Sequence, residues 1–255
     1  MNKKIRMLCF ASSVVAAACT SQAASSVIYS NGFESGYVNG ALLGQDSWAA
    51  YLTASPTVTN GTGVNTSKVI GNSTNTTTIA TTTTGVKKTV ALDFAGATTG
   101  SFSIDIYRNG NISGYMGASI GASTNSGNGI GVYAASNVLK YRDSVGGGTI
   151  VALTDINGNN VLTVNGAWSR ITLNLDFANN QITSAWLTNL TTPGAPTQLY
   201  FGAGNATKTY LNDESSWNQL QVRTDGYGAI PAYLDNILLA GPEPKKNKIS
   251  LVILH

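Results

Sequence analysis

The sequence predicts an all-β fold, an antiparallel sandwich of two sheets formed by a single domain. Apolar and polar residues alternate through much of residues 85–240, and this period of two is typical of strands that are buried on one face. No stretch after residue 23 shows the 3.6-residue period of an amphipathic helix. Charged residues make up only 11% of the 255 residues and the formal net charge is +3, which excludes a coiled coil and charge-driven disorder.

Residues 1–23 have the pattern of a secretory signal peptide. Residues 1–6 carry three basic side chains, residues 7–19 are apolar or small, and Ser21 and Ala23 are the small residues that a signal peptidase reads. The apolar stretch is too short to span a bilayer, so we expect export and no membrane span in the mature chain. Because Cys19 follows three alanines, a lipoprotein signal stays open as an alternative.

Cleavage before Ala24 changes the charge balance and the cysteine content. It removes three basic residues and no acidic one, so the mature chain carries equal numbers of basic and acidic residues. Residues 24–241 show no cluster of Lys and Arg of the kind that binds nucleic acid. Cys9 and Cys19 both lie in the signal segment, so we expect no disulfide and no thiol chemistry.

The strand pattern starts with a segment of unusual composition. Residues 57–84 are almost wholly Thr, Asn, Ser and Gly, and the β-branched Thr favours edge strands there over a flexible loop. Farther along, Asn179 and Asn180 suit a hairpin turn because Asn tolerates a positive φ. In chain order, strands are expected at residues 86–94, 101–106, 114–123, 129–135, 149–153, 170–177, 181–187, 217–223 and 233–239.

Both ends of this region resemble secreted concanavalin A-like and laminin-G-like jelly rolls. Phe33-Glu34, followed by the segment that ends in Gly44-Gln45-Asp46-Ser47-Trp48, is similar to their opening Phe-Glu strand and G-x-L-x-G-Q-x-x-W turn. Residues 232–239 resemble their last strand and that of jelly-roll carbohydrate-binding modules. The resemblance implies one concanavalin A-like jelly roll over residues 24–241. It implies no particular activity, because this architecture hosts lectins, lyases, glucanases and structural modules.

Residues 241–244, Gly-Pro-Glu-Pro, resemble the signature of bacterial PEP-CTERM exported proteins, which are associated with exopolysaccharide. In that family an apolar membrane helix and then an Arg cluster follow the signature. Here three lysines come first, and residues 249–254 are too short to span a bilayer. A truncated tail and a chance Pro-Glu-Pro both stay open. We expect residues 242–255 to be a disordered tail and the protein to be bacterial, either secreted or at the cell surface.

Several kinds of catalysis lack the necessary residues. The only histidine is the terminal His255, so a Ser-His-Asp triad or a His-based metal site has no ordered imidazole. Glucanases of the resembled architecture use an E-x-D-x-E strand, and no two acids of this chain lie two or four positions apart. A pair from distant strands, such as Asp105 and Asp176, stays open, with two solvent-facing strand residues as the ordinary alternative.

A structural calcium ion is the metal that the resemblance implies. Such ions commonly join the first and last strands of jelly-roll modules through the Phe-Glu glutamate and the final-strand aspartate, here Glu34 and Asp235. The alternative is that Glu34 caps a turn and Asp235 is an exposed strand residue. Residues 155–160 begin like an EF-hand loop but lack its Gly and Glu, so a turn at Asn157-Gly158 is the prediction there.

Aromatic residues beside predicted turns are the candidates for carbohydrate binding, because the C–H faces of sugars stack on flat rings. These candidates are Trp48, Tyr51, Trp217 and Tyr227, with core packing as the ordinary alternative for a Trp. Our hypothesis is a non-catalytic exported protein that binds or organises extracellular polysaccharide. Two alternatives stay open: a lyase or glycoside hydrolase whose carboxylates, or Tyr with Arg or Lys, are assembled by the fold, and a structural surface or matrix protein without a specific glycan.

Overall fold

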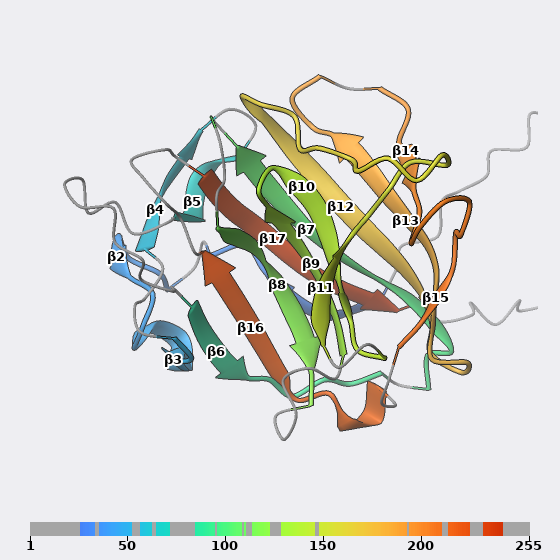
Figure 1. The fold of residues 1–255 in the computed structure, drawn as a ribbon. Coiled ribbons are helices and arrows are strands. Elements are labelled where there is room, and N and C mark those ends of the chain that lie inside the picture. The colour runs from blue at the N-terminus through green and yellow to red at the C-terminus, as the bar shows by residue number, and fades with distance from the viewer. Residues whose placement is uncertain are drawn as a thin grey trace, which may run out of the picture.

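Two antiparallel β-sheets stack face to face in the structure (Figure 1). The computed structural model describes residues 26–33, 36–52, 57–62, 65–71, 85–94, 96–108, 110, 114–122, 129–145, 148–192, 194–210, 214–224 and 232–241. Within these ranges no helix has the length and apolarity needed to cross a membrane. The signal segment, the Pro-Glu-Pro tail and His255 lie outside the described residues.

The first sheet has ten strands in the order β14-β13-β12-β7-β17-β5-β4-β2, with β1 also paired to β17 and β15 to β13. Its longest strands lie at the centre, where β17 is hydrogen-bonded to β7 and β7 to β12. The strands are β1 (Ser26–Asn31), β2 (Gly40–Ala41), β4 (Thr57–Thr62), β5 (Asn65–Gly71), β7 (Thr99–Arg108), β12 (Ala167–Asp176), β13 (Gln181–Asn189), β14 (Thr197–Leu199), β15 (Lys208–Thr209) and β17 (Ala232–Gly241).

The second sheet has seven strands in the order β11-β10-β9-β8-β16-β6-β3. Two short 3-10 helices, η1 (Gln45–Ser47) and η2 (Glu214–Ser216), lie in the connections. The strands are β3 (Ala49–Ala50), β6 (Gly85–Thr89), β8 (Tyr115–Gly121), β9 (Gly129–Ala135), β10 (Val138–Asp143), β11 (Thr149–Ala152) and β16 (Gln219–Thr224).

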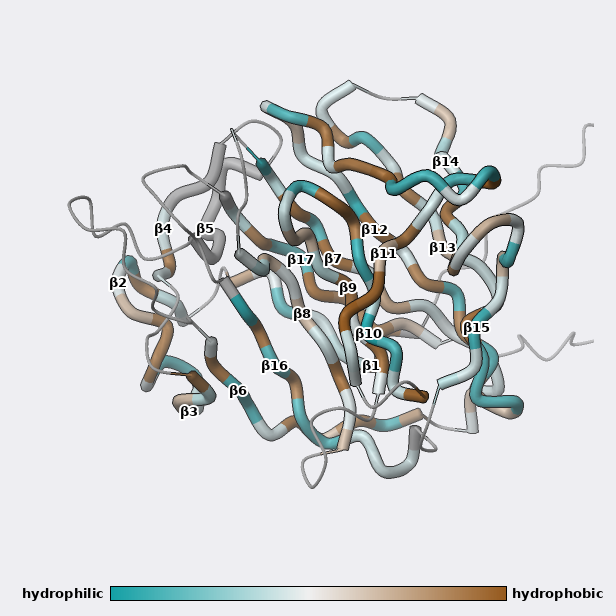
Figure 2. Tube along the Cα trace, in the orientation of Figure 1, coloured by the Kyte–Doolittle hydropathy of each residue, from teal (hydrophilic) through white to brown (hydrophobic). Residues whose placement is uncertain are grey.

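The core forms between the sheets from every second residue of the facing strands. Phe102, Ile104 and Ile106 of β7 point inward, as do Ala118 and Ile120 of β8, and each has at most 1% of its surface exposed. A fully buried aliphatic or aromatic side chain contributes about 1.5–3 kcal/mol. Figure 2 shows the matching alternation of hydrophilic and hydrophobic residues along β16. The intervening residues of each strand are left to form the outer faces.

The strand predictions after residue 84 are confirmed, since each predicted range contains a strand. Within residues 57–84, the expected edge strands are present as β4 and β5, next to β2 at one edge of the ten-stranded sheet. Residues 72–84 lie outside the described residues. The hairpin turn between β12 and β13 is also confirmed, and Asn180 has the positive φ of 50° that the turn requires.

Strand β10 was not expected, nor were the short β14 and β15. The turn that joins β9 to β10 consists of Ser136 and Asn137, whose φ angles are 50° and 65°. Two positive φ angles in a two-residue hairpin turn usually call for glycine, so the sequence lacks the signal that marks such a turn. In the 155–160 loop the predicted turn is confirmed: Gly158 has a φ of 89°, and the Asp155 carboxylate accepts the backbone N–H groups of Asn157 and Asn159.

The segment that resembles the jelly-roll opening folds as a tight loop around one glutamine side chain. The Gln45 amide accepts the Val38 N–H at 2.9 Å and donates to the carbonyls of Val38 and Ala41 at 3.0 and 2.7 Å. Gly44 has a φ of 85°, which favours glycine. The loop therefore places Trp48, the last residue of the motif, in the core, where 2% of its surface is exposed.

Candidate functional site

On the outer face of the seven-stranded sheet, small residues follow strand β8 and long polar side chains lie on the strands beside it. Residues paired across antiparallel strands point to the same side, so the register shows which side chains are neighbours. Gly117 of β8 pairs with Arg223 of β16 on one side and with Tyr133 of β9 on the other. Two positions along β8, Ser119 pairs with Gln221. A strip of small residues therefore runs along β8, with long polar side chains beside it.

We call this surface the basic face. Its centre cannot hold larger side chains: a Cβ on Gly117 would lie 2.2 Å from the Val132 carbonyl oxygen and 2.7 Å from the Tyr133 ring, and one on Gly131 would lie 2.5 Å from the Cβ of Ser119. Its members are Lys87, Tyr115, Gly117, Ser119, Gly131, Tyr133, Lys140, Arg142, Gln219, Gln221 and Arg223.

Tyr133 and Arg142 form the buried part of the basic face. The Arg142 guanidinium donates a 3.0 Å hydrogen bond to the Tyr133 hydroxyl and lies 5.7 Å from the centre of its ring. Tyr133 is fully buried and Arg142 is 7% exposed. Burial by itself lowers the pKa of Arg142, but charge interaction and hydrogen bonding with Tyr133, and charge interaction with Tyr51, raise it above its ordinary value. Arg142 therefore stays charged.

Tyr115 forms the more accessible part of the basic face. Its half-buried ring lies 4.7 Å from the Arg223 guanidinium and 5.9 Å from the Lys140 ammonium, measured from the ring centre. Tyr115 also meets Tyr133 edge to face at 6.4 Å, which joins the two parts. Cations near the face of an aromatic ring are stabilised by its quadrupole. Because Tyr115, Lys140 and Arg223 are only half-buried, a ligand can reach these side chains directly.

Two glutamines of β16 complete the basic face. The Gln221 amide nitrogen donates to the Gln219 oxygen at 2.9 Å, and both side chains are buried. Within the described part of the chain, the Gln221 side-chain oxygen has no hydrogen-bond partner. An unsatisfied buried carbonyl of this kind costs about 1–3 kcal/mol and is relieved by a donor such as a hydroxyl group.

All charged members of the basic face are positive. Lys87, Lys140, Arg142 and Arg223 carry four positive charges, and no Asp or Glu is present on the outer face of β6, β8, β9, β10, β11 or β16 as far as these strands are described. Single-sign charge lining one surface raises the local concentration of a ligand of the opposite charge. The arrangement suits an anion that also offers hydroxyl groups.

Trp48 and Trp217 take the ordinary alternative, core packing. The Trp48 indole N–H donates to the Tyr37 hydroxyl at 3.0 Å beneath the surface. Trp217 is 3% exposed and packs against Phe94 and Tyr210, with ring centres 6.1 and 5.4 Å away. The sequence placed both rings beside turns, and core packing, the ordinary alternative for a Trp, is what the structure shows. Neither ring offers a face to a sugar here.

Of the remaining predicted site residues, the structure describes Tyr51 and Asp235. Tyr51 is half-buried and lies close enough to Arg142 to influence its pKa, so it neighbours the basic face. Tyr227 and Glu34 lie outside the described residues, so stacking at Tyr227 and the calcium site stay predictions. Asp235 is 1% exposed, which corrects the alternative that it is an exposed strand residue. No group of three or more His, Cys, Asp or Glu that could hold a metal occurs among the residues described.

The suggested pair Asp105 and Asp176 is not assembled. Asp105 pairs in register with Arg170, whereas Asp176 pairs with Thr99, which lies six positions before Asp105 in β7 and about 20 Å away. Asp105 is instead opposite Asp235, and both are buried. Because both Asp105 oxygens accept hydrogen bonds from Arg170, this carboxylate is not available to a glycosidic bond.

Reasoning from the sequence missed the basic face as a unit. Both glycine-rich strands, β8 and β9, were predicted, and their Gly and Ser residues recur at every second position. That recurrence places the small residues on one face, and it was the available signal. The cationic neighbours come from three other strands, and only the sheet order brings them beside the strip.

Solved structures similar to this chain share its architecture. The marine PL-14 alginate lyase from Aplysia kurodai superposes with a TM-score of 0.52 at 9% identity, over 86% of this chain and 100% of the lyase. The fold is a concanavalin A-like jelly-roll sandwich. The endo-β-1,4-glucuronan lyase from the fungus Trichoderma reesei matches with a TM-score of 0.45 at 13% identity, over 85% and 96% of the two chains. No family model matches, and a search of curated proteins gave no match.

Proposed function

We propose that this protein binds an acidic polysaccharide across the basic face of its seven-stranded sheet. The observation that carries the proposal is the set of three cations around Tyr115 and Tyr133, Lys140, Arg142 and Arg223, on a face whose described strand residues include no carboxylate. Arginine recognises a carboxylate through two parallel hydrogen bonds, and it keeps its charge at all ordinary pH values. A sugar acid presents one such carboxylate on each unit.

The other members of the basic face suit the neutral part of a sugar. The Tyr115 ring is accessible and presents an apolar surface for the C–H groups of a pyranose. The Gln221 oxygen, which has no partner among the described residues, is buried, and it can accept a hydroxyl proton once a ligand displaces what covers it. Charge supplies attraction, and these groups supply selectivity for a glycan.

A lyase is the second candidate, because a tyrosine lies between two cations. β-Elimination on a uronate moves the C5 proton to a base, forms the C4–C5 double bond and releases the C4 oxygen, which takes up a proton. Tyr115 beside Arg223 and Lys140 has the residue types for this reaction. The fully buried Tyr133 does not reach a substrate in this conformation, which favours binding over cleavage. The fold likeness to an alginate lyase supports keeping this candidate.

The proposed setting is the outside of a bacterial cell. It is supported by the signal-like residues 1–23 and by the Pro-Glu-Pro sequence at 242–244. A protein placed there meets acidic exopolysaccharide as a gel or coat. Its role would then be to bind or organise this material.

The test is co-sedimentation of the protein with a panel of insoluble and gel-forming polysaccharides, acidic and neutral, with an assay of the supernatant for released oligosaccharide. Retention by acidic polymers without product supports the binding role. Release of an unsaturated product, detected by its ultraviolet absorbance, would replace it with the lyase. Retention by neither class would leave a structural surface or matrix protein as the account of the chain.

A further inference from the structure

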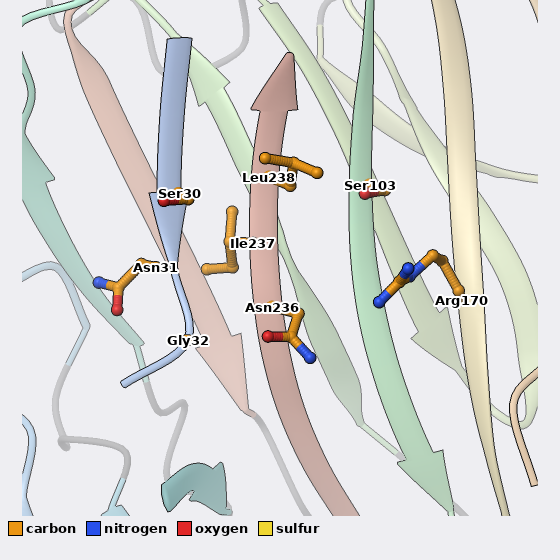
Figure 3. A pocket seen from close by; sticks show the side chains of 8 residues that line it. All are labelled: Ser30, Asn31, Gly32, Ser103, Arg170, Asn236, Ile237 and Leu238. Atoms are coloured by element: carbon orange, nitrogen blue, oxygen red, sulfur yellow. The ribbon is translucent and has the colours of Figure 1, made fainter. Parts of the chain in front are cut away.

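A pocket of about 250 Å³ opens on the other sheet, at the point where β1, β17, β7 and β12 lie side by side (Figure 3). It is therefore separate from the basic face, which belongs to the seven-stranded sheet. Polar side chains and two aliphatic ones surround it. The residues that line it are Ser30, Asn31, Gly32, Ser103, Arg170, Asn236, Ile237 and Leu238.

The pocket lies at a backbone irregularity. Asp235 of β17 pairs with Asp105 of β7, but three residues later Leu238 pairs with Ser103, so β17 has one extra residue in this stretch. Asn236, within the bulge, has a φ of 47°, a left-handed conformation that Asn tolerates better than most non-glycine residues. Bulges of this kind re-aim side chains and are frequent beside binding sites.

The re-aimed Asn236 is held by a buried charged group. Its side-chain amide donates to Asp105 at 2.9 Å, and its backbone N–H donates to Asp235 at 2.8 Å. Arg170 donates two hydrogen bonds to Asp105, of 2.7 and 2.9 Å. The side chain of Asp105 is fully buried, whereas 40% of the Arg170 side chain is exposed. The network therefore fixes Asn236 and Arg170 at the pocket before any ligand arrives.

The lining fits one neutral sugar unit better than an ion. The Arg170 charge is already compensated by Asp105, so the pocket offers no excess positive charge to an anion. Leu238 and Ile237 supply apolar contacts for C–H groups, and Ser30, Ser103 and the Asn236 amide are placed for hydroxyl groups. A few fixed polar groups around an apolar wall are the usual composition of a site for a small polar molecule.

We propose that this pocket is a second glycan site, which binds a neutral pyranose unit through Asn236, Arg170 and Ser103. The site does not depend on the basic face. A chain with both sites can hold two polysaccharide strands on opposite sheets, or two parts of one strand, and thus crosslink a matrix. Linked sites raise the apparent affinity for a polymer without any new contact.

The test is an NMR titration of the ¹⁵N-labelled protein with the methyl glycosides of glucose, galactose, mannose and xylose. At least one is expected to give saturable shifts of the amides in residues 30–32 and 236–238. Two variants localise the binding. Ser30→Trp covers the pocket from an exposed position and should abolish the shifts, and Asn236→Gly keeps the positive φ without the amide and should weaken binding about tenfold or more.

A control variant distinguishes failure of this proposal from failure of the proposed function. Arg223→Gln, on the basic face, should leave the glycoside titration unchanged, so failure of acidic-polysaccharide binding would not affect the outcome here. The pocket proposal is overturned if no glycoside shifts these amides, or if the shifts persist in folded Ser30→Trp. It is also overturned if the amides respond to calcium chloride alone and to no glycoside.

Discussion

The Tyr133 hydroxyl accepts a 3.0 Å hydrogen bond from Arg142, and the Tyr133 ring lies against Gly117 of the neighbouring strand. This contact needs the absence of a side chain at Gly117. Gly117→Ala should therefore lower the free energy of unfolding by about 1–3 kcal/mol through overpacking and should also weaken acidic-polysaccharide binding. Gly194→Ala is the matched control, because a Cβ there meets nothing within 4 Å. Chemical denaturation of both variants checks this; equal stability of Gly117→Ala and wild type would contradict the close approach.

Removing the accessible cations should weaken binding without unfolding the protein. The double variant Lys140→Gln and Arg223→Gln should lower the affinity for an acidic polysaccharide about tenfold or more and should reduce the salt dependence of binding. Lys208→Gln removes one cation from β15 of the ten-stranded sheet, where Lys208 forms an ion pair with Asp143 of β10 away from the outer face, and should leave binding unchanged. Affinity electrophoresis measures all three proteins. Equal loss in the control would mean that overall charge, and not the basic face, is responsible.

The sequence predicts the fold better than it predicts the basic face. Alternation along residues 170–177 and 181–187 predicts a half-buried hairpin, because burial of one face is a local property of each strand. Trp48 and Trp217 show the limit: position beside a turn does not determine the direction of a ring. Tyr133, Arg142 and Arg223 come from three strands, so their association depends on sheet order, which periodicity does not encode. Asn236 tolerates the positive φ of its bulge, but a single Asn within a strand does not by itself predict a bulge.

Tyr37 makes stability depend on pH in the alkaline range. Burial, followed by its hydrogen bond to Asp46, raises the pKa of Tyr37 from 10.0 to about 12. The stabilisation is therefore complete below pH 10 and is lost as the pH rises to about 12. Tyr37→Phe also leaves the buried Trp48 N–H without its partner and should cost about 1–3 kcal/mol at neutral pH. Thermal unfolding of both proteins should show this difference narrowing between pH 10 and 12; a constant difference would refute the assignment.

The ion pair of Asp105 and Arg170 should be strongly coupled. Arg170→Met leaves the fully buried Asp105 carboxylate without its cation and should destabilise the protein by about 3 kcal/mol. Asp105→Asn in that background removes the charge and should recover part of the loss. A double-mutant cycle in urea measures the coupling energy. Additive losses would show that the two side chains do not act as a pair.

The calcium prediction concerns Glu34 and Asp235 and is tested independently of glycan binding. An ion bound only by the folded protein raises the melting temperature, so chelation should lower it and added calcium should restore it. Asp235→Asn should abolish the response to calcium. Metal content is measured before and after chelation. If the metal is removed and the melting temperature does not change, the calcium site is wrong.

The central claim is that the basic face recognises the carboxylates of a polysaccharide. The most direct measurement is a calorimetric titration with alginate fragments and with the same fragments after reduction of their carboxyl groups, at low and high salt. We expect saturable binding of the acidic form that weakens with salt, loss of binding after reduction, and about tenfold weaker binding by the Lys140→Gln and Arg223→Gln variant. Equal affinity for the reduced polymer, or undiminished binding by the variant, would contradict the account.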